Sequence, residues 1–289
     1  MSIPEPARTQ VSVAADVALS VIERRPDPTM TAGTPALLVH GLASNARMWD
    51  GVADALACLG HPSVALDQRG HGRSDTPDDG YDFETLGADL VAVMDATGLD
   101  RPIVVGQSWG ANVVLELADR HPDRVSGVVC VDGGFGAFRD ELPDWATAER
   151  ALTPPDLVGT PLTRLEGWVR TRHADWPESG IAGTLANFRV RDDGTIEPWL
   201  TRPRHMTIAR HLWEHDPVAL YARLGVPVLL LVADPADASG RRERAVTALE
   251  ATGGDLRVRW FRPGDHDLHA QFPERVAAAI DELAREVGA

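Results

Sequence analysis

The chain has 289 residues, of which 44% are hydrophobic and 25% charged, so it can bury a large globular core. Its formal net charge is −15 at pH 7, and all 28 basic residues are arginine. The acidic balance argues against nucleic acid or an anionic membrane as a partner, because both bind basic surfaces. Because lysine is absent, catalysis through a lysine Schiff base is excluded.

The first elements of the chain form a weakly alternating pattern that predicts an antiparallel hairpin over residues 11–13 and 17–22. After a loop near residues 25–33, the pattern changes to continuous apolar runs separated by helical stretches. The runs cover residues 36–39, 64–66, 103–105, 125–131, 226–232 and 256–261. Runs without polar alternation are typical of strands that are covered on both faces. The sequence therefore predicts an α/β protein with a mostly parallel, doubly wound sheet.

Several classes of site and location have no signal in the sequence. No apolar run approaches the roughly 20 residues of a membrane span, and the N-terminal residues lack the features of a signal peptide. We therefore expect a cytoplasmic protein with no membrane partner. The two cysteines belong to no metal-binding spacing, so no metal site is expected. The oligomeric state cannot be read from the sequence.

A sharp strand-to-helix turn is predicted at residues 106–110, which read Gly-Gln-Ser-Trp-Gly. They follow the apolar run at 102–105 and precede a helical pattern at 112–120. Such a turn exposes its central residue and brings strand and helix so close together that the flanking positions must be small. Gly106 and Gly110 satisfy this requirement. The pattern predicts Ser108 as a nucleophile, provided that a base takes its proton.

Three motifs in this order resemble landmarks of the α/β-hydrolase superfamily. They are LLVHGL at residues 37–42, DQRGHGRS at 67–74 and the turn around Ser108. The resemblance covers nearly the whole chain and implies the α/β-hydrolase fold. It also implies that the backbone N–H groups of Leu42 and Trp109 form an oxyanion hole, which stabilises the negative oxygen of a tetrahedral intermediate.

The base predicted by the same resemblance is His266, in the sequence Gly-Asp-His-Asp at 264–267 between the last predicted strand and the last helix. The superfamily order is serine, acid, histidine. The neighbouring His269 is the alternative, and we expect it to be packed or exposed without a catalytic role.

The acid that orients His266 has three candidates. The usual superfamily position is the loop after the strand at 226–232, where Ala233 here replaces the usual glycine. Asp237 fits the usual spacing and is the first choice. Asp234, at the end of the same strand, and Asp132, at the end of the preceding strand, remain open alternatives.

The segment 137–217 breaks the strand–helix rhythm. It contains several prolines, no strong strand pattern, and five of the eight tryptophans, which are Trp145, Trp168, Trp176, Trp199 and Trp213. The resemblance implies a helical cap inserted here after the sixth strand, with core segments 1–136 and 218–289 on either side. A cap excludes water and shapes the pocket, and its tryptophans favour a substrate with an apolar or aromatic part.

The function implied by the resemblance is that of an enzyme, a hydrolase with a serine catalytic triad and no cofactor. It would cleave a carboxylic ester or lactone of a small-molecule acyl substrate through an acyl-enzyme. A proline iminopeptidase-like aminopeptidase or amidase, a C–C hydrolase or perhydrolase, and a non-catalytic binding protein remain alternatives. Epoxide hydrolases and dehalogenases of this fold carry aspartate where Ser108 stands, and hydroxynitrile lyases rely on a lysine, so these activities are disfavoured.

Overall fold

The computed structural model describes residues 7–234, 240–252 and 254–288. Within these ranges, one sheet contains eight strands in the order β1-β2-β4-β3-β5-β6-β10-β11. The strands are β1 (Thr9–Ala14), β2 (Val17–Arg24), β3 (Ala36–Val39), β4 (Ser63–Leu66), β5 (Ile103–Gln107), β6 (Gly127–Val131), β10 (Val228–Ala233) and β11 (Leu256–Phe261).

The sheet is antiparallel only at its N-terminal edge. Strand β2 pairs antiparallel with β1 and β4, whereas the pairs from β4 to β11 are parallel. The predicted hairpin and the mostly parallel doubly wound sheet are therefore confirmed. The loops after β3 and β5 leave the same edge of the sheet because these neighbouring strands are parallel, and the chain order reverses beside β3.

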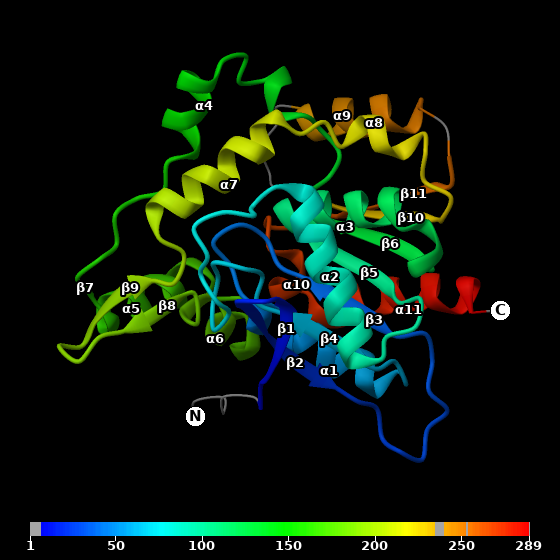
Figure 1. The fold of residues 1–289 in the computed structure, drawn as a ribbon, viewed down its shortest axis with the longest axis horizontal. Coiled ribbons are helices and arrows are strands. Elements are labelled where there is room, and N and C mark those ends of the chain that lie inside the picture. Colours follow the sequence, from blue (N-terminus) through cyan, green and yellow to red (C-terminus); the bar gives the residue numbers. More distant parts are fainter. Residues whose placement is uncertain (1–6, 235–239, 253, 289) are drawn as a thin grey trace.

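Helices cover both faces of this sheet (Figure 1). They are α1 (Asp50–Cys58), α2 (Phe83–Thr97), α3 (Trp109–Arg120), α8 (Val218–Tyr221), α9 (Arg241–Glu250), α10 (Leu268–Gln271) and α11 (Pro273–Val287). Alternate residues of each buried strand face opposite layers: Leu37 and Val39 pack with α2 and α3, and Leu38 packs with α1 and α11. This arrangement explains the continuous apolar runs, because both faces of the central strands are buried.

Residues 137–217, called here the inserted segment, lie beside the sheet at the left and top of Figure 1. The segment contains α4 (Trp145–Leu152), α5 (Leu162–Arg172), α6 (Glu178–Leu185), α7 (Arg202–Glu214) and a small sheet of β7 (Thr160–Pro161), β8 (Phe188–Val190) and β9 (Thr195–Pro198). The sequence pattern predicts no strand here, because strands of two to four residues are too short for alternation to show.

The inserted segment has a small apolar core of its own, in which Val169, Trp176 and Ile196 are buried. This core also includes Met48, from the short 3₁₀ helix at Ala46–Trp49, and Ala270 from α10. Both of these residues belong to short helices in the connections that follow β3 and β11, at the carboxyl edge of the large sheet. The inserted segment is therefore packed directly against the edge at which the loops after β3 and β11 lie.

Candidate active site

Ser108 sits at the turn between β5 and α3, with backbone angles φ 53° and ψ −119°. Such angles are strained for a residue with a side chain. A Cβ atom on Gly106 would lie 2.2 Å from the carbonyl oxygen of Gly110, and one on Gly110 would lie 2.5 Å from that of Val39. Only glycine allows this close approach of strand and helix. The turn has the geometry that the sequence pattern predicts.

Two cavities meet at Ser108 and His266. The first, of about 150 Å³, is the β6-side cavity, which runs along Gly133–Gly136 and includes Trp109 and Arg242 in its lining. The second, of about 240 Å³, is the loop-side cavity, and Leu42, Ala43 and Ser44 are among its lining residues. Ser108 and His266 line both cavities. The structure therefore brings together the serine, the histidine and the two backbone positions that the resemblance implies for an oxyanion hole.

His266 lies in the loop between β11 and α10, and its Nδ1 is 2.7 Å from Oδ2 of Asp132. Because an ionised carboxylate only accepts hydrogen bonds, Nδ1 is the donor and Nε2 carries the free lone pair. The His266 side chain is 51% exposed, whereas that of Asp132 is 1% exposed. One side of the imidazole is thus fixed by a buried carboxylate, and the other remains accessible.

Asp132 comes directly after β6 and has a positive φ of 43°. Its Oδ1 accepts a hydrogen bond from the backbone N–H of Ala233, at the end of the neighbouring strand β10. The next residue, Gly133, packs directly against the turn at Ser108. A Cβ atom on Gly133 would lie 2.3 Å from the carbonyl oxygen of Ser108, so only glycine fits there. The adjacent strands β5, β6 and β10 therefore set the position of this carboxylate.

The other candidate acids lie elsewhere. Asp234 directly follows β10, and its Oδ2 lies 2.7 Å from Nε of Arg262. Asp237, the first choice from the sequence, lies outside the described residues. Among the described candidates, Asp132 is the one that is hydrogen-bonded to His266, which differs from the order of preference that the spacing suggests.

Arg242, near the start of α9, is a neighbour that the sequence analysis does not identify. Its Nη2 lies 2.9 Å from Oδ2 of Asp132, and its Nε lies 3.2 Å from Oδ1. The two residues are separated by 110 positions in the chain. No local pattern marks this arginine among the several at the start of α9, so only the fold reveals the pair.

The charges around His266 act in opposite directions. Desolvation lowers the pKa of His266, but the hydrogen bond to Asp132 and the negative charges of Asp267 and Asp132 outweigh it and raise the pKa above its ordinary value. The charge of Arg242 acts in the lowering direction. For Asp132, burial raises the pKa, but hydrogen bonds from His266 and Arg242 outweigh burial and lower it. Asp132 is therefore an anion at neutral pH.

Two buried histidines shape the loop after β3. The backbone N–H of Gln68 donates to Nε2 of His40, whose Nδ1 lies 2.7 Å from the carbonyl oxygen of Gly41. The backbone N–H of Ala43 donates to Nε2 of His71. Burial lowers the pKa of His40 to about 4 and that of His71 to about 3, so both rings are neutral. They hold the loop that carries Leu42.

His269, the alternative base, is fully buried on α10 with its ring centroid 4.3 Å from that of Trp49. Burial lowers its pKa to about 3. It lines neither of the cavities at Ser108, which agrees with the expectation that it is packed.

Trp109 also has a buried side chain, which stacks on His71. Trp109 therefore borders the β6-side cavity from within the core.

Among the residues that the structure describes, no three or more His, Cys, Asp or Glu side chains lie close enough together to bind a metal ion. None of the described helices has the length and apolarity needed to cross a bilayer.

Fold and site together define a member of the α/β-hydrolase family, to which this chain belongs: the family model described as "alpha/beta hydrolase fold" matches residues 34–234. Epoxide hydrolase B of Mycobacterium tuberculosis is 39% identical over 105 residues, which are 36% of this chain and 30% of that protein. The aligned part thus spans less than a third of this relative.

A longer similarity is found with 2-(acetamidomethylene)succinate hydrolase of Mesorhizobium japonicum, which is 25% identical over 264 residues, 91% of this chain and 90% of that protein. The solved structure of E-2-(acetamidomethylene)succinate hydrolase has a TM-score of 0.76 and 24% identity, covering 96% of this chain and 98% of that one. At this level of identity the structural likeness concerns the fold.

Proposed function

We propose that this protein is a serine hydrolase that cleaves a carboxylic ester or lactone, with Ser108 as nucleophile, His266 as general base and Asp132 as the acid. The observation that carries the proposal is the 2.7 Å contact between His266 Nδ1 and buried Asp132 Oδ2, beside the two cavities that His266 shares with Ser108. We assign the acid to Asp132 and not to Asp237, the first choice from the spacing, because Asp132 is the carboxylate hydrogen-bonded to His266 among the described residues.

In the proposed reaction, the Ser108 oxygen attacks the ester carbonyl carbon while Nε2 of His266 takes the hydroxyl proton. The backbone N–H groups of Leu42 and Trp109 stabilise the resulting oxyanion. The carbon–oxygen bond to the alcohol then breaks, and His266 returns the proton to the departing oxygen. A water molecule hydrolyses the acyl-enzyme by the same steps, giving the carboxylic acid and free Ser108.

Asp132 contributes by holding His266 in the tautomer whose Nε2 can accept a proton, and by stabilising the imidazolium that forms. Its hydrogen bond from Ala233 and its pair with Arg242 keep the carboxylate in place and ionised. In this proposal the inserted segment acts as a cap that sets the size of the substrate, because Phe138, Leu212 and Asn187 line the cavities at Ser108.

The similarity to an epoxide hydrolase does not lead us to propose epoxide opening. A serine that opened an epoxide would form an ether, which water does not hydrolyse under mild conditions, whereas an acylated serine is an ester that water can cleave. The residue at the turn is serine, so acyl transfer is the chemistry that can turn over.

The proposal is tested by labelling the purified protein with a fluorophosphonate and locating the adduct by mass spectrometry. We expect a single adduct on Ser108. A panel of chromogenic esters, lactones and anilides then reports the bond that is cleaved, with esters expected to be fastest. An adduct on another serine would reject Ser108 as nucleophile, and faster cleavage of anilides would favour an amidase or aminopeptidase.

A further inference from the structure

A third cavity lies between the inserted segment and the loop after β3, and no step of the proposed reaction uses it. It has a volume of about 490 Å³. Its apolar lining includes Pro154, Pro155, Leu157, Phe188, Trp199 and Leu200. All of these residues belong to the inserted segment, whereas Ala43 and Ser44 contribute from the core.

This cavity adjoins the loop-side cavity at the nucleophile. Ala43, Ser44 and Asn187 line both the third cavity and the loop-side cavity, which reaches Ser108 and His266. The side chain of Asn45 donates hydrogen bonds to Asn187 and to the carbonyl oxygen of Gly183, so the inserted segment is tied to the core at this junction. A substrate that occupied both cavities would extend from Ser108 past Ser44 and Asn187.

The cavities differ in size. Pockets for small organic ligands usually measure about 300–1,000 Å³. The β6-side and loop-side cavities, at about 150 and 240 Å³, are each below this range, whereas the third cavity, at about 490 Å³, falls within it. The third cavity therefore offers more room for a bulky substrate group than either cavity at Ser108 alone.

Most of the polar groups of the third cavity are engaged with the protein. Arg189 pairs with Glu197, and Arg202 donates to the carbonyl oxygen of Pro154. Asp156 accepts a hydrogen bond from the backbone N–H of Val158. Nε2 of His205 lies 3.1 Å from the carbonyl oxygen of Leu152, and burial lowers the pKa of this histidine. The chemistry left for a ligand is therefore mainly apolar contact, with the buried Ser44 hydroxyl as an unpartnered polar group at the border with the loop-side cavity.

We propose that the third cavity, from here the acyl cavity, binds an apolar acyl chain of medium length or an aryl-substituted acyl group of the ester substrate. This inference rests on the proposed function. The acyl group stays attached to Ser108 through both halves of the reaction, whereas the alcohol must leave before water enters. A cavity lined by the inserted segment suits the group that stays, because its contacts stabilise both transition states.

The test compares p-nitrophenyl acetate with p-nitrophenyl hexanoate. Each buried methylene contributes up to about fourfold in binding, so hexanoate should have the higher kcat/KM, by at least tenfold and at most on the order of 10². Leu157→Trp fills the acyl cavity and Trp199→Leu removes its aromatic wall. We expect each variant to reduce the hexanoate-to-acetate ratio of kcat/KM by tenfold or more.

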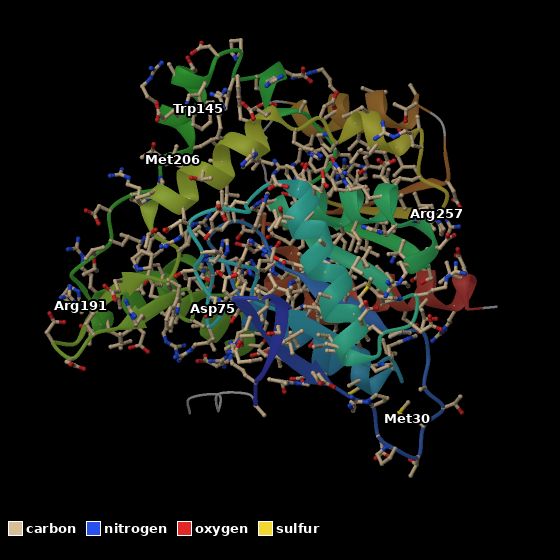
Figure 2. The ribbon with its side chains drawn as sticks, viewed as in Figure 1. Met30, Asp75, Trp145, Arg191, Met206 and Arg257 are labelled. Atoms are coloured by element: carbon tan, nitrogen blue, oxygen red, sulfur yellow. The ribbon has the colours of Figure 1, made fainter. Side chains whose placement is uncertain are left out.

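Trp145→Leu is the matched control. Trp145 is also a partly buried tryptophan of the inserted segment that packs against arginine, but it lies outside the acyl cavity. Figure 2 shows it on α4, at the opposite end of the inserted segment from Arg191 in the β8–β9 turn. We expect this variant to keep the wild-type ratio of kcat/KM.

Fluorophosphonate labelling separates the two proposals. If Ser108 is labelled in wild type and variants but the ratio stays unchanged in both Leu157→Trp and Trp199→Leu, the acyl cavity is wrong and the serine hydrolase stands. If Ser108 is not labelled in the wild-type protein, the proposed function itself fails. An equal loss of the ratio in Trp145→Leu would attribute the effect to general disturbance of the inserted segment and overturn the assignment.

Discussion

The large sheet and the inserted segment are stabilised in different ways. Both faces of the sheet are covered by extensive apolar clusters, and the residues proposed for chemistry extend from the strand ends. The inserted segment has one small apolar core and several aromatic–arginine contacts, such as Arg210 over Trp145 and Trp213. Substitutions at the strand ends should therefore change the chemistry, and those in the inserted segment should change stability or substrate preference.

The largest effect is expected for Ser108→Ala. The hydroxyl contributes the nucleophile and little packing, so kcat should fall by about 10⁴-fold or more while the melting temperature stays close to that of the wild type. Steady-state hydrolysis of p-nitrophenyl acetate and thermal melting provide the two measurements. Ser12→Ala, on the exposed side of β1, is the control and should retain full activity. Activity surviving in Ser108→Ala would place the reaction elsewhere.

The next largest effect is expected for Asp132→Asn. The change keeps the shape of the side chain but removes the charge that orients His266, so kcat should fall by about 10³- to 10⁴-fold. Asp234→Asn breaks a surface pair with Arg262 and should cost less than about tenfold. Asp237→Asn belongs in the same series. If Asp237→Asn were the crippled variant and Asp132→Asn remained active, the choice of acid would be reversed.

A third prediction concerns stability within the inserted segment. Trp176 is buried in its small core, whereas Trp168 on α5 is 61% exposed. We expect Trp176→Ala to lower the free energy of unfolding by about 3 to 5 kcal/mol. Trp168→Ala should change it by less than about 0.5 kcal/mol. Urea unfolding followed by circular dichroism measures both, and similar values for the two variants would show that the segment does not rely on this core.

The smallest effect is expected for Arg242→Gln, and it should appear in the pH profile. His266 must be neutral to accept the serine proton. Because the pKa of His266 is raised above its ordinary value of about 6.5, activity should already be lost above that pH as the pH falls. Arg242 lowers that pKa, so removing its charge should move the acid limb of kcat/KM to higher pH. Activity near about pH 6 should therefore fall more than activity near about pH 8.5.

Arg223→Gln is the matched control for this pH measurement. Arg223 forms a similar two-point pair with Asp119, at 2.8 and 2.9 Å, away from the cavities at Ser108. Its loss should leave the acid limb in place. An acid limb that is unchanged in Arg242→Gln would mean that Arg242 only anchors Asp132.

The strand pattern and the turn at Ser108 could be predicted from the sequence because both are local. Continuous apolar runs mark strands buried on both faces, and two glycines flanking a serine mark a turn in which strand and helix nearly touch. The small sheet of the inserted segment could not be predicted in this way, because its strands are too short to show a period. Its place beside the large sheet depends on packing with Met48 and Ala270.

What the sequence by itself determined is therefore the order along the chain of the strands in the large sheet and the strained turn that carries Ser108, while the resemblance to α/β-hydrolases indicated the histidine loop at residues 264–267. Only the tertiary structure decided that Asp132 bonds to His266 across 134 positions, that Arg242 pairs with the same carboxylate, and that the third cavity adjoins the loop-side cavity. The physical reason is that hydrogen bonds and cavities depend on the distance between atoms. In a parallel sheet, strand ends that are far apart in the chain become neighbours at one edge.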